Sequence, residues 1–182
     1  MHKTISLFFL SFCLLYFTVY AMANDNPSPY EEIYPEIGYK TVEAAADDFE
    51  QHFKQQLKLP LRVPPISFTH QFGRFNNLDD DINDSFEVTF INDKLSEHHY
   101  KIDVRPIENK LTLKEDYILK VFQLKNGTTA TYMKISGFNV LAFERDNWQY
   151  MLSIDKRVSN TVTPETLVDI ANSIDYSTEQ IN

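Results

Sequence analysis

Between residues 66 and 155 the apolar residues recur mostly with a period of two, and this alternation constrains the fold more than any other feature. Such a period places apolar side chains on one face of a strand and polar side chains on the other. Strands joined by short turns pair antiparallel, because parallel neighbours need crossovers of a dozen or more residues. The sequence therefore predicts about six or seven antiparallel strands, over residues 66–73, 86–90, 100–105, 117–125, 128–135, 138–144 and 148–154.

One of these strands and the turn after it carry additional signals. Residues 117–125 are apolar on both faces at several positions, which predicts a central strand of the sheet. Asn126-Gly127 follows, and this dipeptide favours a hairpin turn in which both central residues have positive φ.

Two amphipathic helices flank the predicted sheet. Residues 41–59 carry apolar side chains at helical spacing, with Thr41 as the N-cap and Pro60 as the stop. A second helix opens at Thr163-Pro164, and its predicted buried stripe consists of Leu167, Ile170, Ala171 and Ile174. Since one face of the sheet needs a cover, the predicted fold class is α+β: an N-terminal helix, an antiparallel sheet and a C-terminal helix packed on it.

The first 23 residues have the layout of a secretory signal peptide. Lys3 supplies the positive start, and residues 5–20 form an uncharged run rich in Leu and Phe. Ala21 and Ala23 place small residues at the −3 and −1 positions of a cut before Asn24. We predict cleavage between Ala23 and Asn24, with a cut after Ala21 and an uncleaved anchor as alternatives. The protein is then secreted or held in the cell envelope, with no membrane span after cleavage.

Residues 24–40 hold Pro27, Pro29 and Pro35, which argue against a helix through the segment. We therefore expect an extended leader, with a mobile linker as the favoured interpretation. Residues 41–182 suffice for a single α+β domain with one core.

The composition excludes two classes of function. Cys13, the only cysteine, leaves with the signal peptide, so the mature chain has neither a disulfide nor a thiolate site. Loss of the signal peptide, whose only charged residue is Lys3, changes the net charge from −9 to −10. An acidic surface repels polyanions, so nucleic acid is not an expected partner.

The acidic stretch after the first predicted strand is the only metal candidate. Asp79, Asp81 and Asn83 offer oxygen ligands of the kind that Ca²⁺ prefers, and they are weak candidates. The EF-hand pattern fails at its sixth position, where Asp84 replaces glycine. An acidic surface loop is therefore the favoured interpretation.

We predict no catalytic residue and no cofactor, because the chain contains neither GxSxG nor HExxH. His98 and His99 are adjacent near a strand, so their side chains point to opposite faces and do not share a metal easily. For His70 we expect a place in the core or at its boundary, satisfied by a hydrogen bond.

The C-terminal third resembles a known family. Trp148-Gln149-Tyr150-Met151-Leu152 forms a Y-x-L strand, and Leu167-Val168-Asp169-Ile170-Ala171-Asn172-Ser173-Ile174 reads L-x-x-I-A-x-S-I. Both are similar to a domain of unknown function that occurs outside the membrane in Gram-positive bacteria, in lipoproteins and attached to anti-sigma factors. The resemblance spans residues 128–174. The chain departs from that family in lacking an acylated cysteine, and the family has no established catalytic residues to transfer.

These observations predict an exported, non-catalytic binding or interaction module of a Gram-positive cell envelope. Its expected partner is an envelope protein or a small ligand. The alternatives are a secreted hydrolase with an unrecognised active site and a weak calcium-responsive module.

Overall fold

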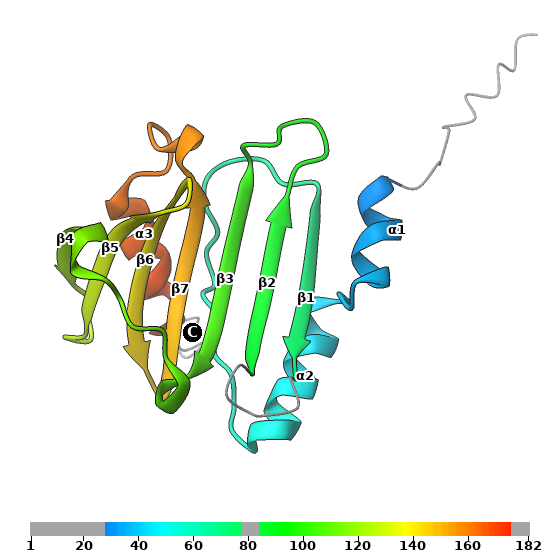
Figure 1. Cartoon of the computed structure of the whole chain (residues 1–182), viewed down its shortest axis with the longest axis horizontal. Helices are drawn as coiled ribbons and strands as arrows, with labels where there is room; N and C mark the ends of the chain where they lie inside the picture. The colour runs from blue at the N-terminus through cyan, green and yellow to red at the C-terminus, as the bar shows by residue number, and fades with distance from the viewer. Residues whose placement is uncertain (1–27, 78–83, 176–182) are drawn as a thin grey trace, which may run out of the picture.

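The computed structural model describes residues 28–77 and 84–175 (Figure 1). The predicted signal peptide, with its cut between Ala23 and Asn24, lies outside the described residues. Within the described residues the elements are α1 (Pro29–Glu36), α2 (Val42–Phe53), β1 (His70–Asn76), β2 (Ser85–Ile91), β3 (His99–Pro106), β4 (Ile118–Gln123), β5 (Thr129–Ile135), β6 (Phe138–Arg145), β7 (Trp148–Asp155) and α3 (Pro164–Ala171).

The seven strands form one antiparallel sheet in the order β1-β2-β3-β7-β6-β5-β4. The predicted α+β fold is confirmed. β3 pairs with β7 at the centre of the sheet, so the chain must travel from β3 to the far edge before β4 begins. Residues 107–117, which we name the strap, connect β3 to β4 and cross in front of β7 and β6 (Figure 1).

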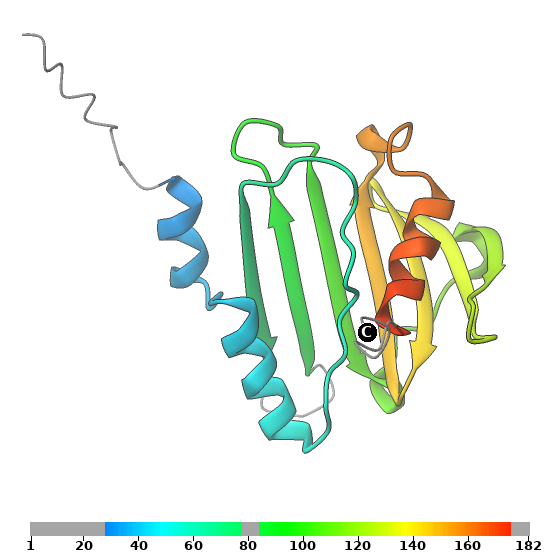
Figure 2. The same cartoon turned by 180° about the vertical axis from the view of Figure 1, so that it is seen from behind.

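The helices α2 and α3 cover one face of the sheet, which we name the inner face. Figure 2 shows both helices on this face, with the chain that follows α2 running between them. α2 packs on β1 and β2, and α3 packs on β6. The predicted stripe of the C-terminal helix is buried as expected. The largest fully buried side chains of the core are Tyr100, Tyr150, Phe49 and Phe86.

Gly73 allows α2 to lie close to β1. A Cβ atom at this position would stand 2.7 Å from the Cα of Val42 and 2.9 Å from the Cβ of Ala45. Any other residue would therefore push the helix away from the strand.

α2 ends at Phe53, six residues before the predicted end. Lys54 adopts the left-handed conformation with φ of 54°, which stops the helix without a proline. The carboxylate of Glu50 then accepts a hydrogen bond from the backbone N–H of Leu57 at 2.7 Å.

The prediction that residues 24–40 contain no helix is wrong. Pro29 begins α1, where its missing N–H does no harm, and Pro35 stands in the last turn, where it removes one backbone hydrogen bond. Aromatic packing holds this short helix against the sheet. The ring of Tyr34 stacks on Phe72 of β1 with centroids 4.5 Å apart.

The prediction that residues 117–125 form a central strand is also wrong. β4 is the edge strand of the sheet, bonded to β5 alone. Leu119 and Val121 are 54% and 56% exposed. An apolar pattern on both faces is typical of a buried strand, but here no described element covers those side chains.

The hairpin turns differ from the predicted one. At Asn126-Gly127 only Gly127 has a positive φ, 83°, so this turn is not the tight type that the dipeptide favours. Both central residues have positive φ at Ser136-Gly137 and at Asp146-Asn147 instead.

Candidate functional site

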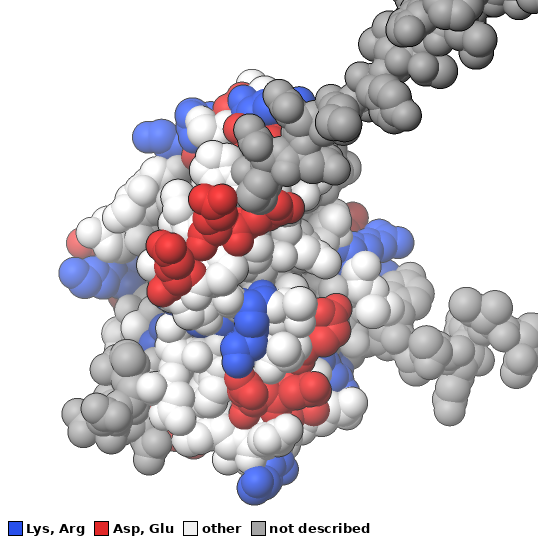
Figure 3. Space-filling model, turned by 90° about the vertical axis from the view of Figure 1, so that its right-hand side faces the viewer, with Lys and Arg blue, Asp and Glu red and all other residues white. Residues whose placement is uncertain are grey.

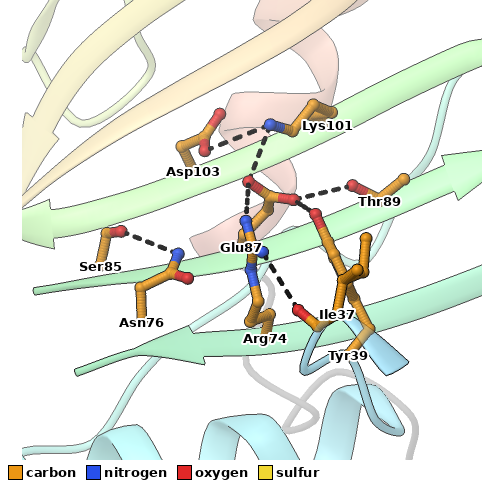
Figure 4. A network of polar contacts seen from close by, with 9 residues as sticks. All are labelled: Ile37, Tyr39, Arg74, Asn76, Ser85, Glu87, Thr89, Lys101 and Asp103. Carbon is orange, nitrogen blue, oxygen red and sulfur yellow. Dashed lines mark hydrogen bonds and ion pairs between the residues drawn. The ribbon is translucent and has the colours of Figure 1, made fainter. Parts of the chain in front are cut away.

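The sheet face opposite α2 and α3, which we name the outer face, carries charged groups near β1, β2 and β3. Arg74, Glu87 and Asp103 lie side by side on the three strands, because the register pairs Arg74 with Glu87 and Glu87 with Asp103. Figure 4 shows how neighbouring side chains converge on Glu87. We name this group the outer-face cluster: Tyr39, Arg74, Glu87, Thr89, Lys101 and Asp103.

Glu87 is the centre of the cluster, and its side chain is 7% exposed. Lys101 Nζ lies 2.8 Å from Oε2, and Arg74 Nη2 lies 3.8 Å from the same oxygen. The hydroxyls of Thr89, at 3.2 Å, and Tyr39 both donate to Oε1. Burial alone would raise the pKa of Glu87, but the bonds from Lys101 and Tyr39 and the two cationic charges outweigh it and lower the pKa.

Asp103 shows the opposite behaviour. The surrounding protein removes water from its carboxylate and raises its pKa to about 6, and the negative charge of Glu87 adds to this effect. Lys101, whose Nζ lies 3.8 Å from Oδ1, opposes the rise, as do the charges of Arg105 and Arg74. Two neighbouring carboxyl groups therefore titrate in opposite directions from their ordinary values.

The cluster also fastens the segment between α1 and α2 to the sheet. The guanidinium of Arg74 lies 4.4 Å from the ring centroid of Tyr39 and donates to the backbone carbonyl of Ile37 at 3.4 Å. Lys40 and Gly73 exchange two backbone hydrogen bonds of 2.8 Å. Lys101 and Arg74 both pair with Glu87, and Glu87 and Arg74 also contact this segment. The cluster is therefore an ion-pair network that orders the N-terminal part of the domain.

A second feature of the outer face is a groove of about 340 Å³ beneath the strap. Gln149 and Glu144 lie at its wall, and each also holds the strap. The side chain of Gln149 bonds to the backbone of Leu111, and Lys110 pairs with Glu144 at 2.6 Å. The groove is lined by Leu113, Thr128, Thr129, Thr131, Ala142, Phe143, Glu144 and Gln149. Its volume is near the lower limit of small-molecule pockets, and its hydroxyl groups suit a polar ligand.

The third feature is the free edge of β4. Tyr117, Leu119 and Val121 expose large apolar side chains there, with exposed fractions of 46%, 54% and 56%. Edge strands with such side chains are templates for pairing with another chain, because their outward backbone groups are unpaired within the sheet.

The predicted calcium candidates Asp79, Asp81 and Asn83 lie outside the described residues. The neighbouring Asp84 is fully buried, and its Oδ2 lies 3.0 Å from Nε2 of His52 on α2. Within the described residues, no group of three or more His, Cys, Asp and Glu side chains is arranged to hold a metal.

The histidines lie at separate places. His70 faces α1, where Nδ1 bonds to the hydroxyl of Thr69 at 2.7 Å and Nε2 lies 3.8 Å from Glu31, so a hydrogen bond satisfies it as expected. His98 Nδ1 bonds to the carbonyl of Ser67 at 2.9 Å. His99 packs edge-on against Phe138 on the outer face, and burial lowers its pKa. The structure does not gather them into one site.

Acidic side chains cover the surface over α1 and α2 (Figure 3). They belong to exposed residues of both helices, namely Glu31, Glu32, Glu36, Glu43, Asp47 and Asp48. Lys40 stands among them and pairs with Asp48. The remaining negative charge keeps this side of the domain solvated and repels polyanions.

Sequence reasoning missed the outer-face cluster. Glu87, Lys101 and Asp103 occupy the polar positions of alternating strands, which predict solvent exposure. Only the register of β2 against β3, together with the return of Tyr39 to the sheet, reveals that these groups meet.

No protein-family model, no curated protein and no solved structure matches this chain. No helix in residues 28–77 and 84–175 is long and apolar enough to cross a membrane.

Proposed function

We propose that this protein is an exported, non-catalytic interaction module of a Gram-positive cell envelope, and that β4 is the edge through which it binds. The uncovered β4 strand carries the proposal. An extended segment of a partner would add to it as an eighth strand, with backbone hydrogen bonds supplying affinity and exposed side chains supplying selectivity.

The hydrogen-bond pattern of the β4–β5 hairpin supports this geometry. The N–H of Leu124 donates to the carbonyl of Thr128 at 2.8 Å, so Leu124 directs its backbone toward β5. Directions alternate along a strand, and Phe122 and Lys120 therefore also face β5. Val121 and Gln123 direct their N–H and C=O groups outward, where a partner strand would meet them.

The outer-face cluster supports the non-catalytic part of the proposal. The two oxygens of Glu87 accept from Tyr39, Thr89 and Lys101, and the guanidinium of Arg74 adds an ion pair at 3.8 Å. Within the cluster, Tyr39 and Lys101, whose pKa values are raised, both bind Glu87, whose pKa is lowered, and Tyr39 belongs to the N-terminal segment. This is how a structural ion-pair network behaves.

Export rests on the layout of residues 1–23, and the envelope location rests also on the resemblance of residues 128–174 to an extracytoplasmic domain. Both remain sequence-based arguments. They agree with a domain that stays folded without disulfides through a large aromatic core.

Val121→Pro tests the proposed edge. Proline at this position removes an outward N–H and leaves the β4–β5 hydrogen bonds in place, as edge strands tolerate. Val121→Thr is the matched control, because it keeps the N–H and the branched shape. Each exported variant is used to capture envelope proteins, and the captured proteins are identified and quantified.

The proposal predicts that the wild type and Val121→Thr recover the same partner, while Val121→Pro loses at least tenfold of it. Equal recovery by Val121→Pro would place the interaction elsewhere. Turnover of cell-wall, peptide or ester substrates by the purified protein would overturn the non-catalytic assignment.

A further inference from the structure

We propose that Asn126 is a site of spontaneous covalent modification, at which the side-chain amide is lost and an isoaspartyl link to Gly127 forms. Asn126 and Gly127 lie at the tip of the hairpin between β4 and β5, and both residues are exposed. Asn126 is the only asparagine of the chain that precedes a glycine. The reaction needs no partner protein and does not depend on the proposed function of β4.

Gly127 leaves the attacking atom accessible. This atom is the backbone nitrogen of Gly127, which a side chain on the same residue would shield. Among the described residues other than its two chain neighbours, no atom lies within 4 Å of the position that a Cβ of Gly127 would take. Glycine also rotates about φ and ψ more freely than other residues, so its nitrogen can approach the side chain of Asn126.

A hydrogen bond folds the side chain of Asn126 over Gly127. Oδ1 of Asn126 accepts from the backbone N–H of Thr128 at 3.0 Å, which is the local contact of an Asx turn. The bond draws electrons from Cγ toward Oδ1, so Cγ becomes a better target for a nucleophile. The NH2 group, which departs in the reaction, takes no part in this bond.

One bond of the turn opposes the reaction. The N–H of Gly127 donates to the carbonyl of Leu124 at 2.9 Å, and it must leave this acceptor before the nitrogen can attack. Exposed hairpin tips open locally at a small cost in free energy. The attack therefore starts from a locally opened turn, while the strands of the hairpin stay paired.

The reaction balances with water as its only other reactant. The nitrogen of Gly127 gives up its proton and bonds to Cγ of Asn126. The bond from Cγ to the side-chain nitrogen breaks, and this nitrogen takes up a proton and leaves as ammonia. Water then opens the resulting succinimide ring. Addition at Cγ yields aspartate, whereas addition at the main-chain carbonyl carbon of Asn126 yields isoaspartate, in which the main chain runs through Cβ and Cγ.

Isoaspartate should loosen the closing end of the hairpin. Its main chain is longer by one carbon, and its free carboxylate adds a negative charge to the turn. Both changes disturb the bond of 2.8 Å from the N–H of Leu124 to the carbonyl of Thr128. We expect amide exchange at Leu124 to become at least tenfold faster in the isoaspartyl form. Exchange at Met133, which pairs with Ile118 at the other end of β5, should be unchanged.

Peptide mapping of the folded full chain after incubation at mildly alkaline pH tests the site. The tryptic peptide of residues 126–134 contains no other asparagine, and its modified forms are heavier by about 1 Da. A sample digested without incubation gives the background. We expect Asn126 to convert at least tenfold faster than Asn92, which is buried and whose Oδ1 accepts from two backbone N–H groups. Chromatography should separate isoaspartate from aspartate in the product.

Two variants test the mechanism. Gly127→Ala shields the nucleophile, and Asn126→Gln must close a six-membered ring, so each should slow the conversion at least tenfold. Asn147→Gln, in another exposed turn, is the matched control and should leave the rate at Asn126 unchanged. The proposal would be overturned if Asn126 stays intact in the folded chain while it converts in guanidinium chloride. Aspartate without isoaspartate, or a wild-type rate in Gly127→Ala, would also overturn it.

Discussion

The side chain of Gln149 binds the backbone of Leu111 in both directions, as a neighbouring strand would. The N–H of Leu111 donates to Oε1 at 2.8 Å, and Nε2 donates to the carbonyl of Leu111 at 3.0 Å. Gln149 lies on the central strand β7, and Leu111 lies in the strap. One buried amide thus fixes the segment that carries the chain from the middle of the sheet to its free edge.

Gln149→Leu should release the strap. The variant leaves two backbone groups of Leu111 without these partners, which destabilises the protein by about 1–3 kcal/mol. Urea unfolding measures the loss, and faster amide exchange at Leu111 localises it. Lys110→Ala is the control in the same segment, because its ion pair with Glu144 is exposed and contributes about 0–1 kcal/mol. Equal effects of the two variants would contradict the role of Gln149.

Gly73→Ala should destabilise the packing of α2 on β1. The added methyl group would overlap the backbone of Val42, so the helix must move. We expect this shift to lower the free energy of unfolding by about 1–3 kcal/mol. Gly127→Ala is the control, since open space surrounds its Cβ position and only the positive φ of 83° is strained. Urea unfolding should show the larger loss for Gly73→Ala, and the reverse order would refute the close approach.

Asp103 should make the protein less stable as the pH rises from about 4 to about 6. The folded-state pKa of about 6 exceeds the usual unfolded value of about 3.9, so the folded state holds the proton more tightly in this window. Its contribution is fully present below pH 4 and is lost as the pH rises through 6. Asp103→Asn should therefore gain about 1–3 kcal/mol relative to the wild type between pH 4 and pH 8. Urea unfolding of both proteins across this range checks the difference, and parallel pH profiles would contradict it.

Glu87→Gln should loosen the segment between α1 and α2. The substitution removes the charge that holds Lys101 and Arg74, and it weakens the acceptor of the Tyr39 hydroxyl, which we expect to destabilise the protein by about 1–3 kcal/mol. Limited proteolysis within residues 37–41 should become faster. Glu165→Gln, which breaks an exposed pair with Lys120, is the control and should leave that segment unchanged. Unaltered cleavage in Glu87→Gln would show that the cluster does not hold the segment.

The sequence predicts the strands of this fold better than it predicts which strands lie next to each other in the sheet. The sequence patterns find seven strands, although the first is β1 at His70–Asn76 and not residues 66–73 as predicted. The stripe of Leu167 and Ile170 finds the face of α3 that is buried. The position of β4 at the edge could not be predicted, because it follows from the pairing of β3 with β7, which separates β4 from β3 in the sheet. The strap that spans this distance is bonded by Gln149, which in the sequence looks like an ordinary polar strand position. Apolar character on both faces then suggests a centre, although the strand lies at an edge.

The prediction for residues 24–40 was wrong for a related reason. Pro29 and Pro35 argue against a helix locally, but one occupies the first helical position and the other the last turn. Packing of Tyr34 on Phe72 compensates for the hydrogen bond that Pro35 removes. That contact joins residues 38 positions apart, so no local sequence pattern predicts it. The outer-face cluster is hidden in the same way, since it depends on cross-strand register.

Amide hydrogen exchange along β4 tests the central claim most directly. In the free protein at low concentration, the N–H groups of Lys120 and Phe122 should exchange slowly, because they face β5, and those of Val121 and Gln123 should exchange rapidly. In the complex with the captured partner, the exchange of the N–H groups of Val121 and Gln123 should slow at least tenfold. A bound state in which the exchange of Val121 and Gln123 is unchanged would contradict the assignment of β4 as the interaction edge.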